Sequence, residues 1–333
     1  MDKIANLRAN ERRELFQETA ARKGIHPAVV EKDFWVCWVL KHIFEDPGMR
    51  SYVIFKGGTS LSKVFGLIER FSEDIDLILD WSLLGYGPGQ QDPFPDDLSN
   101  TKRDQFNKQF NEAAAAYIRE TLCPQLRVLL KICPAVRLSI DVHEGQVVEI
   151  HYPAAFSETY LRPEVRLEIG PLASWVPHDE YSIRSYAADA FPKIFAEPDF
   201  PVIAIKAERT FWEKATILHQ QVHNPRPIPS RYSRHYYDLF RLAESPIRAV
   251  ALADLPLLWD VVAFKQRFYP CNWARYSEAR PGTFKLIPPP GGIDRLKADY
   301  EQMRVMIFGE RPTFAHITVM LQALEDEING LVS

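Results

Sequence analysis

The sequence has few of the features that mark secreted, membrane-spanning or polyanion-binding proteins. It contains only four cysteines, none of them in a CxxC pair, and we expect reduced thiols rather than a disulfide framework. No run of 18 uncharged apolar residues occurs, which argues against a membrane span, and the polar stretch Met1–Phe16 lacks the apolar segment of a signal peptide. The net charge is only −4, so a nucleic-acid partner would need a local basic patch. These absences predict a cytoplasmic protein.

What is present predicts two lobes. With 333 residues, 46% of them hydrophobic, the chain can build a sizeable core. The first 46 residues have a helical pattern, period-two or apolar runs predict strands at 52–55, 75–79, 136–141, 147–152 and 165–169, and a long helix is expected over 101–122. Residues 81–100, rich in Gly, Pro, Asp and Gln, indicate an exposed insertion. Helices are predicted at 206–221, 232–244, 254–268, 294–307 and 313–328. We therefore expect an α+β lobe with a mixed sheet over residues 1–200 and an α-helical lobe over 201–333.

A Gly-Gly turn follows the first predicted strand. A short helix is expected to open at Thr59 or Ser60, and backbone N–H groups at a helix start suit a phosphate, which glycine allows to approach closely. Neighbouring hydroxyls and lysines add donors and positive charge. The predicted nucleotide-binding residues of this segment are Gly57, Gly58, Thr59, Ser60 and Lys63.

Two aspartates follow on the next strand. Asp74 and Asp76 share one face because side chains alternate along a strand, with Cα atoms roughly 6.8 Å apart. Two carboxylates at this spacing repel one another unless a cation lies between them. Mg²⁺, which usually takes one or two carboxylates plus phosphate oxygens, fits this arrangement, with Mn²⁺ as the alternative.

These two segments together resemble the first motif of polymerase-β-like nucleotidyltransferases. More narrowly, the sequence resembles the AbiEii-type nucleotidyltransferase toxins of bacterial toxin–antitoxin and phage-abortive systems. The similarity continues in Val165–Gly170, Glu208–Ala215 and Ser233–Leu239 and covers about residues 30–245. The resemblance implies a polymerase-β-like lobe, a nucleoside triphosphate as substrate, the 3′ end of tRNA as acceptor and a cognate antitoxin as partner.

A third carboxylate would orient or deprotonate the attacking hydroxyl. The strand 165–169 offers Glu168, which shares a face with Arg166, and the strand 136–141 offers Asp141. The pattern leaves both open, and either could be an exposed strand charge. The resemblance favours Glu168, with Asp141 in reserve.

Two further residues lie on predicted helices. Lys214 borders the apolar stripe of its helix, so it is either a surface lysine or one whose ammonium reaches a cleft. Asp238 lies opposite the apolar stripe of the next helix, where it could simply pair with Arg234 at the surface. The resemblance implies instead that Lys214 meets the triphosphate and that Asp238 is an active-site residue.

Two other segments carry weaker signals. Residues 226–241 combine arginines with Tyr232, Tyr236 and Tyr237. Such a segment can bind RNA phosphates and bases, but a charged, solvent-exposed helix face explains the pattern equally well. Glu31-Lys32-Asp33 resembles a family segment, but its physical role does not follow from the sequence.

The sequence thus predicts a metal-dependent nucleotidyltransferase with Asp74, Asp76, Glu168, Lys214 and Asp238 as catalytic residues. Alternatives are a nucleotidyltransferase that modifies a protein or small molecule, an inert NTP-binding or antitoxin-binding module, and a metal-dependent nuclease. The Gly-Gly turn disfavours the nuclease because a nuclease needs no triphosphate site.

Overall fold

The computed structural model describes the chain except residues 73, 88, 93–98, 142, 157–161 and 332–333. The chain forms two compact units: Met1–Val64 with Phe71–Ile205, and Phe65–Arg70 with Lys206–Ser333. The boundary near residue 205 falls five residues after the predicted one. The short segment Phe65–Arg70, which lies within the predicted range of the first lobe, is part of the second unit.

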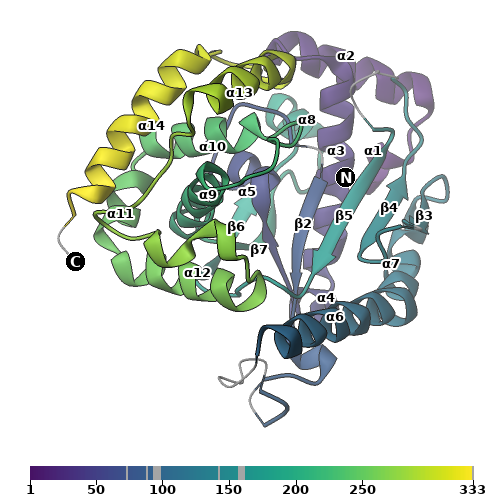
Figure 1. The fold of residues 1–333 in the computed structure, drawn as a ribbon. Helices are drawn as coiled ribbons and strands as arrows, with labels where there is room; N and C mark the ends of the chain where they lie inside the picture. The colour runs from purple at the N-terminus through teal and green to yellow at the C-terminus, as the bar shows by residue number, and fades with distance from the viewer. Residues whose placement is uncertain (73, 88, 93–98, 142, 157–161, 332–333) are drawn as a thin grey trace. The chain divides into compact units, whose positions relative to one another are not determined.

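The first unit is a mixed α/β structure (Figure 1). Its strands are β1 (Val53–Lys56), β2 (Asp74–Leu79), β3 (Arg137–Ile140), β4 (Val147–His151), β5 (Glu164–Gly170), β6 (His178–Ile183) and β7 (Phe200–Ile205). Its α-helices are α1 (Asp2–Ala5), α2 (Ala9–Lys23), α3 (Pro27–Glu45), α4 (Pro47–Arg50), α5 (Gly57–Lys63), α6 (Asn100–Tyr117), α7 (Cys123–Leu129) and α8 (Tyr186–Ala190). Short 3₁₀ or π turns are η1 (Trp81–Leu84), η2 (Ile118–Leu122), η3 (Leu130–Ile132) and η4 (Pro192–Ile194).

The strands form one seven-stranded sheet in the order β3-β4-β5-β2-β1-β7-β6. The pairs β1–β7 and β2–β5 are parallel and the others antiparallel, which confirms the predicted mixed sheet. Strands β6 and β7 were not predicted. Strand β6 carries mostly exposed polar residues at the sheet edge and β7 contains Pro201, so neither has a clear strand pattern.

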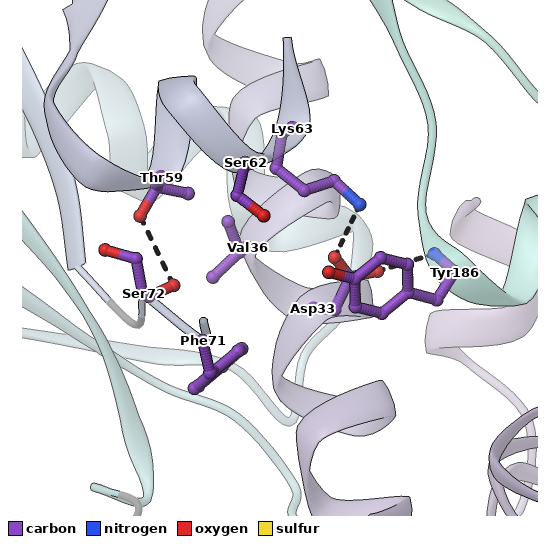
Figure 2. A pocket seen from close by; sticks show the side chains of 8 residues that line it. All are labelled: Asp33, Val36, Thr59, Ser62, Lys63, Phe71, Ser72 and Tyr186. Carbon is purple, nitrogen blue, oxygen red and sulfur yellow. Dashed lines mark hydrogen bonds and ion pairs between the residues drawn. The ribbon is translucent and has the colours of Figure 1, made fainter. Parts of the chain in front are cut away.

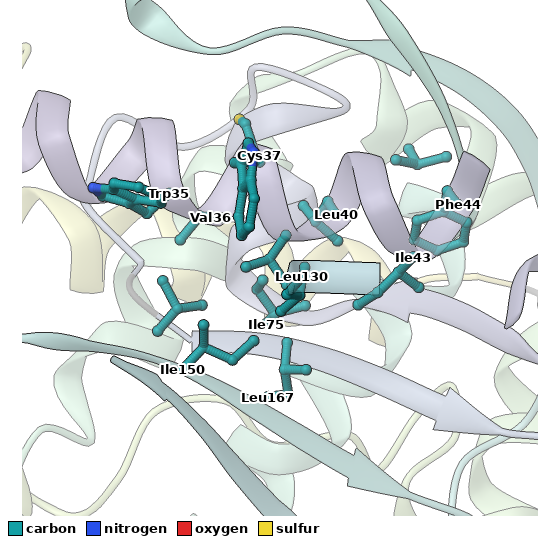
Figure 3. Close-up of a cluster of buried hydrophobic side chains, with 14 of the residues drawn as sticks. Trp35, Val36, Cys37, Leu40, Ile43, Phe44, Ile75, Leu130, Ile150 and Leu167 are labelled. Atoms are coloured by element: carbon teal, nitrogen blue, oxygen red, sulfur yellow. The ribbon is translucent and has the colours of Figure 1, made fainter. Parts of the chain in front are cut away.

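Helix α3 covers one face of this sheet. Pro27 opens the helix, and Nδ1 of His26 accepts the N–H of Ala28. Side chains of α3 gather with those of β2, β4 and β5 in one buried cluster that includes Leu40 and Ile75 (Figure 3). Each such aliphatic side chain stabilises the fold by about 1.5–3 kcal/mol. Because this face is apolar, the alternate residues of β2 and β5 point to the other face.

The second unit is mainly helical. Its α-helices are α9 (Ala207–Val222), α10 (Ser233–Glu244), α11 (Ile247–Ala253), α12 (Leu255–Phe268), α13 (Pro290–Met303) and α14 (Phe314–Asn329), with 3₁₀ turns η5 (Asn272–Ala274), η6 (Tyr276–Glu278) and η7 (Arg304–Met306). Helix α11 was not predicted, and α13 begins four residues earlier than expected. In the described part of the chain, no helix is both long and apolar enough to cross a bilayer.

Candidate active site

The Gly57 turn and the acid strand meet directly. Strand β1 runs into α5, which begins at Gly57, two or three residues earlier than predicted. Lys56 pairs with Asp76 across the antiparallel ladder, so Asp76 lies beside the turn. Gly57 has φ +81°, and a Cβ placed on it would stand 1.9 Å from Oδ2 of Asp76. The carboxylate of Asp76 therefore packs against the bare Cα of Gly57, and only glycine leaves room for it.

Three predicted acids share one face of the sheet. Asp74 and Asp76 are two residues apart on β2 and half-buried, while Ile75 between them is buried on the opposite face. In the parallel pair β2–β5, Asp76 is in register with Glu168. Glu168 is exposed. The structure thus brings Asp74, Asp76 and Glu168 together beside the Gly57 turn.

Asp141 lies farther from this group. It follows β3, and β4 and β5 separate β3 from β2. Its carboxylate accepts the N–H groups of His143 and Glu144 and pairs with Arg166 at 3.2 Å. The backbone N–H of His143 is the largest cause that lowers the pKa of this carboxyl, with Glu144 and Arg166 adding to it. The register therefore favours Glu168 over Asp141 as the acid beside Asp76.

Arg166 places a positive charge on the same face. It is in register with Asp74 and is only 7% exposed. Its guanidinium lies 3.2 Å from Asp141, 3.3 Å from Glu149 and 3.4 Å from Glu144. The charge of Arg166 thus balances one acid of β4 and two acids between β3 and β4, at the position next to Asp74.

The acid face has the donor chemistry of a divalent-ion site. Asp74 and Asp76 offer hard carboxylate oxygens, and the carboxylate of Asp76 lies against the backbone of Gly57 at the start of α5. Within the described residues, no group of three or more His, Cys, Asp or Glu side chains could hold an ion by itself. Two carboxylates plus substrate oxygens is the ligand set that Mg²⁺ commonly takes.

The hydroxyls predicted to bind phosphate are engaged with backbone. Thr59 donates to the carbonyls of Ser72, at 3.3 Å, and Asp74. Ser60 donates to the carbonyl of Gly57 at 2.9 Å. These bonds connect α5 to the start of β2 and close the first turn of α5. Thr59 and Ser60 would therefore contact a ligand mainly through their backbone groups.

Lys63 is held in a pocket of the first unit (Figure 2). Its ammonium lies 2.6 Å from Asp33 and 4.0 Å from the ring centre of Tyr186. The other oxygen of Asp33 accepts the backbone N–H of Tyr186 at 2.6 Å. Burial opposes the charged form of Lys63, but Asp33 outweighs it and raises the pKa of the lysine above its ordinary value. Its predicted contact with a nucleotide stays a prediction.

Glu31, Lys32 and Asp33 of α3 bind backbone groups of distant segments. All three side chains are buried. Glu31 accepts the N–H groups of Ala155 and Phe156, and Lys32 donates to the carbonyls of Arg162 and Glu164. These residues of α3 therefore anchor backbone segments whose polar groups need partners.

In the second unit, Lys214 and Asp238 form an ion pair at 2.9 Å. The expectation that Asp238 lies on the outer face of its helix is wrong, because its side chain is fully buried. Arg70 also binds this carboxylate, through Nε to Oδ1 at 2.6 Å and Nη2 to Oδ2 at 2.8 Å. Burial opposes ionisation of Asp238, but Arg70 and Lys214 outweigh it and hold the pKa of the carboxyl below its ordinary value.

Residues 226–241, which combine arginines with tyrosines, are only partly exposed. Tyr236 and Tyr237 are buried, so the interpretation in which they stack on RNA bases is wrong. Arg226, Arg231 and Arg234 are exposed. No sequence pattern marks Arg70, and His235, which contacts Lys214, stands out only as part of this stretch.

Acids on paired strands beside a glycine-opened helix define a candidate nucleotidyl-transfer site, and the family match of the chain agrees with that class. The chain matches the nucleotidyl transferase AbiEii toxin family of type IV toxin–antitoxin systems over residues 38–324. It therefore belongs to this family of nucleotidyltransferase toxins.

Two solved structures match the chain over most of its length. The nucleotidyltransferase toxin MenT4 from Mycobacterium tuberculosis H37Rv is 13% identical, with 95% of this chain and 96% of that chain covered at a TM-score of 0.45. JHP933 from Helicobacter pylori is 15% identical, with 90% and 93% covered at a TM-score of 0.44. No curated protein sequence matches the chain.

Proposed function

We propose that this toxin uses Mg²⁺ to move a nucleoside monophosphate from a nucleoside triphosphate onto the 3′ end of tRNA. The observation that carries the proposal is the packing of the Asp76 carboxylate against Gly57, with Glu168 in register beside it. This arrangement puts carboxylate oxygens, the start of α5 and a third acid in one place. Membership of the toxin family supports the transferase class and implies an antitoxin counterpart.

In this proposal, Asp74 and Asp76 hold the metal ion. When bound, Mg²⁺ supplies positive charge to the triphosphate oxygens. Gly57 and Gly58 offer backbone to the phosphates, since the nearby hydroxyls of Thr59 and Ser60 are bonded elsewhere. Positioning and electrostatics would supply most of the rate enhancement, as in other phosphoryl transfers.

Glu168 and Lys214 have complementary roles. Glu168 orients the acceptor hydroxyl and takes its proton, which its exposure on the acid face allows. Lys214 donates to phosphate oxygens, and Asp238 holds its ammonium. The exposed Arg226, Arg231 and Arg234 are proposed to contact RNA phosphates.

The test is transfer of label from each nucleoside triphosphate to total tRNA. We expect label on tRNA with Mg²⁺ and none after chelation, and loss of label when periodate has destroyed the 3′-terminal diol. Asp76→Asn should abolish transfer, whereas Asp104→Asn, at an exposed position of α6, should not. Label that appears only on protein or a small molecule would overturn the tRNA acceptor.

Two further outcomes decide the remaining alternatives. RNA that becomes shorter rather than labelled would identify a nuclease. No transfer to any acceptor, together with equal growth of cells that express wild type or Asp74→Ala without an antitoxin, would identify an inert module.

A further inference from the structure

The second unit contains a buried network of charged groups centred on Lys214. Helix α9 contributes Lys214, α10 contributes His235 and Asp238, and Arg70 comes from the segment Phe65–Arg70. Arg70 and Lys214 are 6% and 8% exposed and Asp238 is fully buried. Charged groups removed from water to this degree have defined geometry, because each needs its partners in place.

Arg70 fixes the plane of the Asp238 carboxylate. The two groups form a bidentate pair, with bonds of 2.6 and 2.8 Å to the two carboxylate oxygens. Such paired bonds set orientation as well as energy, and the arginine fork is rigid where a lysine would be free to rotate. Oδ2 is then presented to Lys214 at 2.9 Å.

Backbone contacts hold Arg70 in place. Arg70 forms a β-bridge with Ile307, and the carbonyl of Glu69 accepts the N–H of Phe308 at 2.8 Å. The side chain of Glu69 lies 3.6 Å from Arg241 of α10. The segment that carries Arg70 is therefore anchored within the second unit, although in sequence it lies between α5 and β2.

His235 supplies the second acceptor. Its Nδ1 lies 3.2 Å from the ammonium of Lys214, and since the ammonium only donates, Nδ1 accepts and the proton of the neutral ring is on Nε2. The ring of Tyr232 lies edge-on to it at 4.9 Å between ring centres. Burial and the nearby Lys214 lower the pKa of His235 well below its ordinary value, which keeps Nδ1 available as an acceptor.

We propose that Arg70 and His235 are positioning residues that orient the ammonium of Lys214 so that its third N–H is directed to a phosphate oxygen of the bound nucleotide. A lysine ammonium has three N–H donors. Among the described residues, Asp238 and His235 accept two of them. The inference rests on the proposed function, in which Lys214 binds the triphosphate.

Substitutions at His235 test the proposal through a rescue. His235→Phe removes the acceptor and keeps a ring, whereas His235→Asn places an amide oxygen near the position of Nδ1. We expect Phe to weaken nucleoside triphosphate binding about tenfold, the usual effect of one lost bond to a charged group, and Asn to restore most of it. The readouts are the dissociation constant by calorimetry and KM against kcat in the transfer reaction.

A double-mutant cycle separates positioning from a general structural effect. In a Lys214→Ala background, His235→Phe should cause no further loss of nucleotide binding, because the group that it orients is gone. An equal loss in both backgrounds would overturn the proposal. So would equal binding by the Phe and Asn variants.

Arg70 is tested first through the pKa of Lys214 in the nucleotide-free protein, which keeps that result independent of substrate. Burial and the charge of Arg70 lower the pKa of Lys214, and Asp238 opposes them. In NMR titrations of carbon-13-labelled lysine, with Lys214→Arg to assign the resonance, Arg70→Gln should raise the pKa of Lys214. Arg70→Lys, which keeps the charge, should leave the pKa lowered yet weaken nucleotide binding, because the bidentate contact is lost.

These measurements distinguish failure of the proposed function from failure of the positioning roles alone. If the wild type binds no nucleoside triphosphate, or Lys214→Ala binds it normally, the proposed function fails and this inference with it. If Lys214→Ala abolishes binding while variants at Arg70 and His235 bind normally, only the positioning roles are overturned.

Discussion

Asp76 occupies the space that a side chain on residue 57 would need. Oδ2 of the carboxylate lies 1.9 Å from the position of a Cβ on Gly57, and its Cγ lies 2.6 Å away. A displaced turn would therefore displace the proposed metal ligand. The positions of Gly57 and Asp76 are therefore coupled, although 18 residues separate them in the chain.

Gly57→Ala should consequently abolish nucleotide transfer while leaving the fold largely intact. The added methyl group would push Asp76 from its position, and the backbone at φ +81° adds about 1–2 kcal/mol of strain. Gly24→Ala is the matched control, because Gly24 also has positive φ, +66°, but nothing lies within 4 Å of an added Cβ. We expect a small loss of thermal stability in Gly24→Ala, a larger one in Gly57→Ala because of the clash with Asp76, and loss of transfer in Gly57→Ala alone. Full activity of Gly57→Ala would contradict the proposed site.

Glu168→Gln should reduce kcat for transfer about 10²–10⁴-fold, the range for loss of a general base, because an amide cannot take the acceptor's proton. Glu168 is in register with Asp76, whereas Asp141 is bonded to backbone N–H groups beyond β3. Asp141→Asn should lower the melting temperature and change kcat little. Rates of the two variants under saturating substrate compare the candidates directly, and a larger loss in Asp141→Asn would reverse the assignment.

The acid face could be predicted from the sequence because its signals are local. Two-residue alternation places Asp74 and Asp76 together, and the glycines mark the turn. The position of Glu168 beside Asp76 depends on the pairing of two strands whose residues are 92 positions apart in sequence. The sequence pattern does not predict which strands pair, whereas the register of β2 and β5 in the structure places the two acids side by side.

Contacts that depend on tertiary packing could not be predicted. Arg70 and Asp238 are 168 residues apart in sequence, and helical periodicity alone put Asp238 at the surface. Glu31, Lys32 and Asp33 are charged yet buried, against the usual distribution, because each satisfies backbone or ionic partners from distant segments. Local patterns contain no information on such partners.

The pair Lys63–Asp33 offers a test of whether Lys63 serves the fold or the nucleotide. Lys63→Met leaves Asp33 buried without its cation and should lower the free energy of unfolding by about 3 kcal/mol. Removing both charges in Asp33→Asn/Lys63→Met should cost less than the sum of the single changes. Urea denaturation measures these free energies. If the double variant keeps wild-type affinity for nucleoside triphosphates, the role of Lys63 is structural; a large loss of affinity would support the predicted nucleotide contact.

The stability of the second unit should fall at mildly acidic pH because of His219. This buried ring donates through Nε2 to the carbonyl of Arg275 at 3.1 Å and accepts the N–H of Lys285 at Nδ1, so it is neutral. Burial lowers its pKa to about 4. Between that value and about 6.5, the unfolded chain takes up a proton that the folded chain excludes, so stability present above pH 6.5 is lost as the pH falls towards 4. The loss amounts to at most about 3 kcal/mol. Melting temperatures from pH 7 to pH 4 for wild type and His219→Gln measure it, and the variant should show a flatter dependence on pH; parallel curves would exclude His219 as the source.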